Sequence, residues 1–185
     1  EDGTTTQDWN VTITEQQIVI TPIRDIQYVA DTANLSPSPY LGQIVTTQGV
    51  VTGIGSVGFF IQDGSGPWSG LYIYTSGAVV SKGDLITITG KVDEYNGLTE
   101  LKQITNLTVN SSNNPLPEPM LINGHDLHES LEGVLVRAEH YKCYVKAGTT
   151  ELGAHNMSWY RSLTDETDTV STHTLMLYPD RKSVV

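Results

Sequence analysis

Apolar and polar residues alternate in short segments through the first two thirds of the chain, which predicts an all-β fold. Turns rich in Gly, Asp, Asn and Ser separate the segments, and Tyr95-Asn-Gly97 has the composition of a tight hairpin turn. The predicted strands cover residues 43–54, 58–62, 71–75, 85–89 and 98–109.

Gly49 lies inside the long first strand of this series. A glycine in the middle of a strand often marks a bulge, or a bend where a barrel turns a corner. Five strands at this spacing, the first of them long and bent, predict an OB-fold, a five-stranded Greek-key barrel, over residues 23–115.

The segments on either side of the barrel are less regular. Residues 1–22 are expected to form a strand or hairpin extension, because apolar and polar residues alternate over 9–13 and apolar residues follow at 18–20. The composition of residues 110–119 is that of a linker. Residues 116–185 are expected to form a β-rich half, for which a degenerate second OB-like unit is one possibility, since Glu132-Gly-Val-Leu-Val136 echoes Gln48-Gly-Val-Val51.

Composition narrows the possible functions. The chain carries 10 Lys+Arg against 21 Asp+Glu, a formal net charge of −11, which argues against a tight, unaided binder of the phosphate backbone. No apolar run is long enough to span a membrane. Cys143 is the single cysteine, so neither an intrachain disulfide nor a Cys-based zinc site is possible. The acidic, Thr-rich and Lys-poor composition favours a secreted or cell-surface protein.

Several segments carry a resemblance to a known family. They are Ile23–Gln27, Ser38–Gly42, Gly49–Thr52, Gly58–Gly66, Gly83–Asp84, Thr89–Val92, Glu94–Leu101, Pro115–Pro117 and Glu132–Val136. On these residues the chain resembles the OB-fold domains of bacterial extracellular, sugar-non-specific nucleases and related secreted multidomain proteins. In that family a separate domain performs catalysis. The resemblance therefore implies a non-catalytic accessory module that binds single- or double-stranded DNA or RNA.

The alternation also indicates a candidate ligand-binding face. Phe59, Ile61, Leu71 and Ile73 share one parity, which leaves their neighbours on the other face of the second and third strands. OB-folds bind ligands across these strands, where exposed aromatic rings stack on bases. The candidate residues are Phe60, Gln62, Trp68, Tyr72, Tyr74, Lys91 and Lys102.

Other interpretations of these residues stay open. The aromatic side chains could instead pack beneath the N-terminal segment or the second half of the chain. Stacking on sugar rings would suit a carbohydrate-binding or adhesion module equally well, and a structural spacer would need no ligand.

No cofactor, metal site or catalytic residue is predicted. Calcium is the one candidate ion, through the acidic turn residues Asp63, Asp84, Asp93 and Glu94, although turn chemistry explains these positions without a metal. His125 and His128 would share one face of a helix, but a short solvated helix or loop accounts for them. The sequence contains neither a G-x-S-x-G elbow nor a P-loop.

Overall fold

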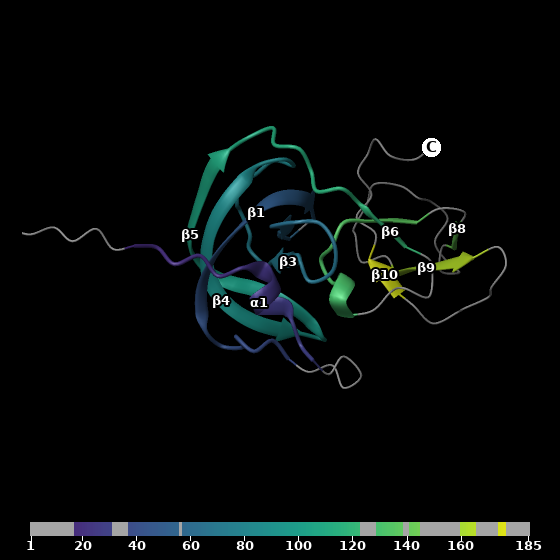
Figure 1. Ribbon diagram of the computed structural model, residues 1–185, viewed down its shortest axis with the longest axis horizontal. Coiled ribbons are helices and arrows are strands. Elements are labelled where there is room, and N and C mark those ends of the chain that lie inside the picture. The colour runs from purple at the N-terminus through teal and green to yellow at the C-terminus, as the bar shows by residue number, and fades with distance from the viewer. Residues whose placement is uncertain are drawn as a thin grey trace, which may run out of the picture.

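Five strands close into a barrel in the computed structural model (Figure 1). They are β1 (Ile44–Ile54), β2 (Phe59–Gln62), β3 (Gly70–Ile73), β4 (Leu85–Tyr95) and β5 (Leu98–Ser111). Their order around the barrel is β1-β2-β3-β5-β4, with β3 and β5 parallel and every other pair antiparallel. This strand order confirms the predicted OB-fold.

The structure describes residues 17–30, 37–55, 57–122, 129–138, 141–144, 160–165 and 174–176. The predicted strand at 9–13 and the His125–His128 pair lie outside these residues.

The long strand β1 is shared between two neighbours. Residues 44–50 pair with β4, and residues 50–54 pair with β2, with a register shift between Val51 and Gly53. A Cβ at Gly49 would lie 2.9 Å from the backbone oxygen of Gln62, closer than real Cβ atoms come. This close approach accounts for a glycine at position 49, next to Val50, where β1 passes from one neighbour to the other.

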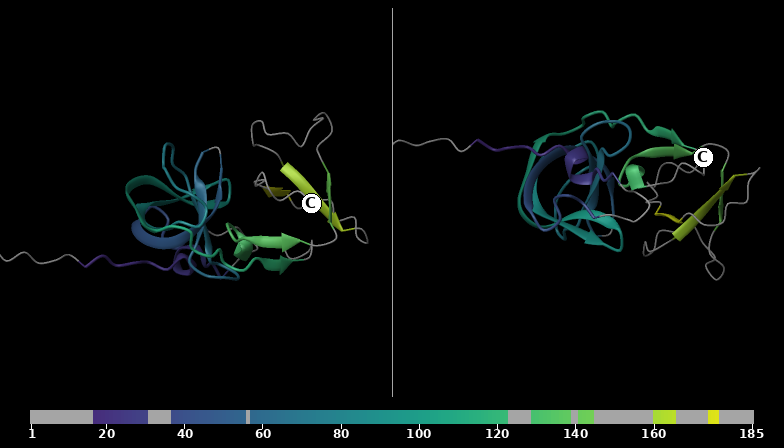
Figure 2. Two further views of the ribbon diagram at one scale, coloured as in Figure 1. Left: turned by 90° about the horizontal axis from the view of Figure 1, so that it is seen from above. Right: turned by 60° about the horizontal axis from the view of Figure 1, so that its bottom comes forward.

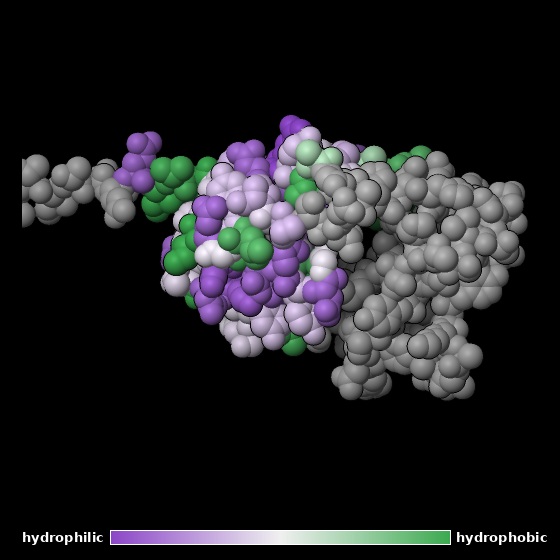
Figure 3. All heavy atoms as spheres, turned by 90° about the horizontal axis from the view of Figure 1, so that it is seen from below, coloured by the Kyte–Doolittle hydropathy of each residue, from purple (hydrophilic) through white to green (hydrophobic). Residues whose placement is uncertain are grey.

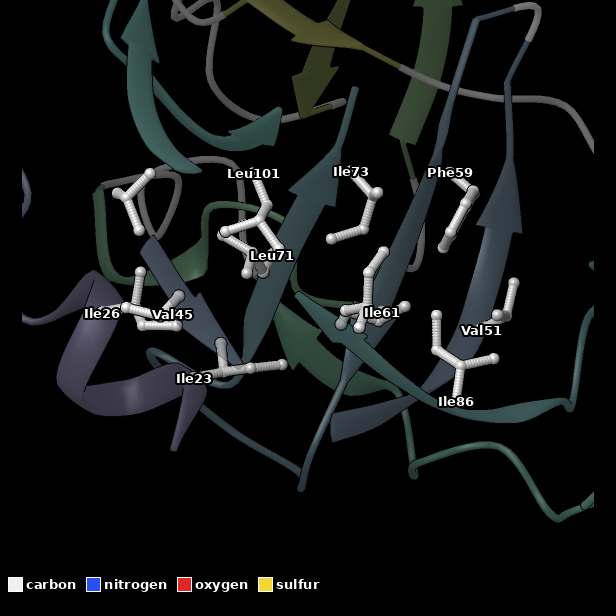
Figure 4. Close-up of a cluster of buried hydrophobic side chains, with 12 residues drawn as sticks. Ile23, Ile26, Val45, Val51, Phe59, Ile61, Leu71, Ile73, Ile86 and Leu101 are labelled. Carbon is white, nitrogen blue, oxygen red and sulfur yellow. The ribbon is translucent and has the colours of Figure 1, made fainter. Parts of the chain in front are cut away.

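The core fills the barrel with aliphatic side chains from alternating positions and one aromatic ring, that of Phe59. Helix α1 (Ile23–Gln27) closes one end, and Figure 4 shows Ile23 and Ile26 pointing from it toward Val45 and Leu71. The sequence pattern did not predict this helix, because five residues contain little more than one helical turn.

β4 and β5 form a long twisted ribbon that extends beyond the predicted strand ends. β4 continues to Tyr95, beyond the end at residue 89 that alternation predicts. The ladder shifts register between Thr89 and Lys91, and Gln103 on β5 adopts a left-handed φ of 50°. This bulge bends the ribbon so that it can wrap around the core.

Beyond the barrel the described elements are short (Figure 2). β6 (Met120–Ile122) pairs in parallel with β7 (Val136–Ala138), and a 3₁₀ helix (Glu129–Leu131) precedes β7. β8 (Tyr141–Tyr144), β9 (Tyr160–Asp165) and β10 (Thr174–Met176) form an antiparallel sheet in the order β10-β9-β8. The stretch Glu132–Val136, whose β-like pattern echoes residues 48–51, is not a strand, because residues 132–135 form a turn and coil and β7 begins only at Val136.

The strand expected at residues 18–20 is also wrong. These residues form coil that leaves the barrel, and Ile18 and Val19 are exposed. The backbone contact to β1 comes one residue later, where the Thr21 amide donates to the Thr46 carbonyl at 2.7 Å.

The barrel surface seen from below in Figure 3 is mainly hydrophilic, with apolar side chains in small separate patches.

No helix among the described residues has the length and apolar character that a membrane crossing requires.

Candidate nucleic-acid interface

The outer face of β2 and β3, where OB-folds bind ligands, carries an aromatic pair that is largely covered. Phe60 and Tyr72 are cross-strand partners, and their ring centroids lie 4.9 Å apart. The Tyr72 hydroxyl donates to the Val57 carbonyl in the turn between β1 and β2. Tyr72 is only 8% exposed, so the expectation that it offers a free stacking surface is wrong.

The other end of this face is covered by residues 129–135, which we call the cover segment. The Leu135 amide donates to the Gln62 side-chain oxygen at 2.7 Å, and the Trp68 amide donates to the Ser130 carbonyl at 2.7 Å. Gln62 is 1% exposed and therefore cannot contact a ligand in this conformation. The side chain of Gln62 thus packs beneath the second half of the chain, and at Trp68 the contact with that half is made by the backbone amide.

Two glycines bring the cover segment and β3 into backbone contact. A Cβ added at Gly70 would lie 2.1 Å from the carbonyl carbon of Gly133, and Gly133 itself has a left-handed φ of 66°. No other residue type fits at Gly70 without moving the cover segment. The contact therefore depends on a glycine on each side, Gly70 in β3 and Gly133 in the cover segment.

A buried carboxyl fastens the same segment to the barrel. Glu132 accepts hydrogen bonds from the Thr99 amide at 2.9 Å and from the Gln27 side-chain amide at 3.3 Å. Burial raises the pKa of Glu132 from 4.5 to about 8, with a smaller contribution from the neighbouring carboxyls Glu129 and Glu94, while its two hydrogen bonds act in the opposite direction. The raised pKa favours the protonated form of Glu132 at neutral pH.

Three of the predicted residues form an accessible row on the outside of β3, β5 and β4. Lys91 and Lys102 are directly opposite each other in the β4–β5 ladder, and both are partly exposed. Tyr74 follows β3, its amide donates to the Leu101 carbonyl at 2.9 Å, and its side chain is 50% exposed. Tyr74 lies near Lys102, and so does the Glu100 carboxyl. We call these residues the Tyr74–Lys91–Lys102 row.

Lys102 also forms an ion pair with Asp93, its diagonal neighbour on β4. Their hydrogen bond raises the pKa of Lys102 and lowers the pKa of Asp93. Both side chains are about 30% exposed, so the pair is accessible to solvent and to competing anions.

Trp68 belongs to a different cluster, at the opposite end of β3 from Tyr74. Its ring meets that of Tyr28 edge-on, with centroids 5.4 Å apart, and the Arg24 guanidinium lies 5.4 Å from the Tyr28 ring centre. Arg24 and Tyr28 were not among the predicted residues, because the short helix that positions them gave no periodic signal.

The four acidic residues considered for calcium do not converge. Asp63 accepts from the Ile23 amide at 2.8 Å, Asp84 from the Ser81 amide at 2.7 Å, and Glu94 from the Ser38 amide at 3.0 Å, while Asp93 binds Lys102. Within the part of the chain that the structure describes, no three His, Cys, Asp or Glu side chains are placed to hold a metal ion.

No protein-family model matches the sequence. The chain is 33% identical over 114 residues to "Endonuclease YhcR" of Bacillus subtilis (strain 168). Among solved structures, the hypothetical protein YgiW from E. coli matches with a TM-score of 0.31 and 19% identity, over 37% of this chain and 76% of that one. The OB-fold assignment rests on strand order and not on this second likeness. The match to the endonuclease covers 52% of this chain but only 9% of the endonuclease, so the similarity extends to a small part of a much longer protein.

Proposed function

We propose that this chain is a secreted, non-catalytic module that binds single-stranded nucleic acid as an accessory to a nuclease. The observation that carries the proposal is the Tyr74–Lys91–Lys102 row: two lysines directly opposite each other, beside an exposed tyrosine, on the outside of an OB barrel. The similarity to part of an endonuclease supports a nuclease as the functional setting. The acidic, Lys-poor composition supports an extracellular one.

The paired lysines favour an anionic ligand. Like charges directly opposite each other in an antiparallel ladder destabilise the sheet. Here the sheet accommodates this pair in a chain that has only 10 basic residues. Asp93 forms an ion pair with Lys102 and also lies near Lys91, and the Glu100 carboxyl acts on Lys102 as well. A phosphate group between Lys91 and Lys102 would relieve their repulsion, and an incoming strand would compete with Asp93 for Lys102.

Tyr74 supplies a ring on which a base can stack. A base that stacks on an exposed aromatic ring gains about 1–3 kcal/mol, and stacking tolerates any sequence. Bases are available for stacking in a single strand but not in a duplex, so the row selects single-stranded nucleic acid. The covered Phe60–Tyr72 pair plays no part in this interaction.

The net charge of −11 requires that few phosphates are contacted. With one or two phosphates bound, the logarithm of the affinity should fall with the logarithm of salt concentration at a slope of only about −0.7 to −1.4. A slope as steep as that of a basic DNA-binding domain would contradict binding through this row.

Fluorescence anisotropy with a labelled single-stranded thymidine oligonucleotide tests the proposal. The double variant Lys91→Ala/Lys102→Ala and the single variant Tyr74→Ala should each bind about tenfold more weakly than the parent chain. Lys82→Ala, in the turn before β4, and Tyr95→Ala, at the end of β4, are the matched controls and should bind as the parent does. No binding by the parent chain, or equal binding by all variants, would refute the proposal.

The remaining parts of the proposal have their own measurements. Incubation of the chain with plasmid and single-stranded DNA in the presence of Mg²⁺ or Ca²⁺ should yield no cleavage. Fractionation of the source cells should recover the protein outside the cytoplasm.

A further inference from the structure

The geometry points to a second binding site, for a neutral carbohydrate ring, where helix α1 meets the loop between β2 and β3. Its residues are Arg24 and Tyr28 from α1 and the coil after it, and Trp68 from the loop; we call them the aromatic corner. The planes of the Tyr28 and Trp68 rings are 72° apart, so the two rings form two walls of a corner. The aromatic corner shares no residue with the Tyr74–Lys91–Lys102 row, and the inference does not depend on the proposed function.

Trp68 occupies a backbone conformation that opposes its presence. Its φ of 68° is left-handed, a region that suits glycine and is unusual for a bulky side chain. Backbone strain of this kind concentrates at ligand-binding sites, where the surrounding structure holds it in place. Here the Trp68 amide is held by the Ser130 carbonyl, and the next residue, Ser69, is hydrogen-bonded to Gly66 and Gln62. An indole ring is thus present where a glycine would cost less.

The corner is also rigid before any ligand arrives. The Asp63 carboxylate accepts from the Ile23 amide, which ties the start of α1 to the β2–β3 loop. The Gln27 side chain donates to the Gly70 carbonyl at 2.7 Å and ties the end of the helix to β3. A site that is fixed in this way loses little conformational entropy when it binds.

A solvent-open hollow of about 390 Å³ lies beside the Tyr28 ring and is lined by Arg24, Asp25, Tyr28 and Pro39. This volume lies within the range of small-molecule sites, roughly 300–1,000 Å³. Tyr28 is 47% exposed, and Arg24 and Asp25 are also exposed. The hollow therefore offers an apolar wall, a guanidinium that donates hydrogen bonds and a carboxylate that accepts them.

The charges of the hollow select the class of ligand. The positive charge of Arg24 is balanced by the negative charge of Asp25, so the lining has no net charge that would attract phosphate. The chain as a whole is acidic. A sugar ring suits this lining better than a nucleotide, because it presents C–H groups to an aromatic face and hydroxyls to the two charged groups. It also introduces no negative charge.

Titration of the full chain with three soluble trisaccharides, while the heat of binding is recorded by isothermal titration calorimetry, tests this inference. The probes are maltotriose, cellotriose and triacetylchitotriose. At least one should produce a saturable change that is absent in Trp68→Gly and shifted about tenfold or more to higher concentration in Tyr28→Ala and Arg24→Ala. Trp68→Gly should keep its stability in urea, since glycine relieves the strained φ. Tyr95→Ala removes a tyrosine outside the corner and should bind as the parent does.

Three results would overturn the inference. One is the absence of a saturable change with all three sugars. Another is sugar binding that survives in both Trp68→Gly and Tyr28→Ala. The third is binding of a thymidine oligonucleotide that is lost in Trp68→Gly, which would make the corner a nucleobase site. Because the Tyr74–Lys91–Lys102 row is intact in these variants, failure here leaves the nucleic-acid measurement unaffected.

Discussion

Glu132→Gln should remove the contribution that the Glu132 carboxyl makes to the pH dependence of the free energy of unfolding. The folded chain holds the Glu132 proton up to a pKa of about 8, whereas the ordinary value is 4.5. Between these two values the unfolded state binds fewer protons than the folded state. The stabilising contribution of the protonated carboxyl is therefore fully present below pH 4.5 and is lost as the pH rises through about 8.

The size of this effect follows from the shift. One pKa unit corresponds to about 1.4 kcal/mol, so the free energy of unfolding should fall by about 3 kcal/mol between pH 4.5 and pH 7, and by about 1 kcal/mol more up to the folded pKa. Glutamine keeps the oxygen that accepts from Thr99 and Gln27, and places an amide where the carboxyl carries its proton. The variant should therefore match the parent near pH 4.5 and be more stable than the parent at pH 7.

Urea unfolding of both proteins at several pH values gives the difference between their free energies of unfolding as a function of pH. Burial also raises the pKa values of Glu129, Glu100 and Asp63, but these groups are present in both proteins, so their titration cancels in the difference. Glu118→Gln controls for the change in net charge, because its side chain is exposed. Parallel profiles for the parent and Glu132→Gln would refute the argument. Glu132→Ala, which also removes the acceptor, should be destabilised at every pH because the buried Thr99 amide loses its partner.

Three further substitutions test the contacts around the barrel. Gly70→Ala places a Cβ 2.1 Å from the Gly133 carbonyl carbon and should lower the free energy of unfolding in urea by about 1–3 kcal/mol; an unchanged value would mean that the cover segment moves aside freely. Tyr72→Phe removes the hydroxyl that donates to the β1–β2 turn and should cost about 1 kcal/mol in thermal unfolding, unless water replaces it and the melting temperature stays the same. Asp93→Asn releases Lys102 from its ion pair and should strengthen oligonucleotide binding severalfold in the anisotropy assay, whereas weaker binding would show that Asp93 holds Lys102 in its working position.

The barrel could be predicted from the sequence because its signals are local. Alternation identifies Ile61 and Leu71 as core residues, and Gly49 marks a position of close backbone approach within a single strand. Helix α1 is too short for its period to be read, and Arg24 and Tyr28 were missed with it.

The covered ligand face could not be predicted, for a different reason. Parity shows that Gln62 and Tyr72 point away from the core, but it does not show whether another part of the chain lies over them. The residue that binds Gln62, Leu135, is 73 positions away in sequence. The alternation of residues around Leu135 is typical of a strand and gives no sign of this contact. A contact of that separation leaves no trace in local periodicity.

The cover segment has a consequence for the order of events during synthesis. All five barrel strands are complete once Ser111 has been added, but the residues that close over Gln62 and Gly70 come 18 or more positions later, from Glu129 onward. A chain that emerges from its N-terminus can therefore form the barrel first, with the polar edge of β2–β3 still hydrated. The Glu132 carboxyl must then take up its proton as it becomes buried. The closing equilibrium is accordingly linked to proton uptake between pH 4.5 and about 8, and closure should become less favourable as the pH rises even though the barrel strands themselves are already in place.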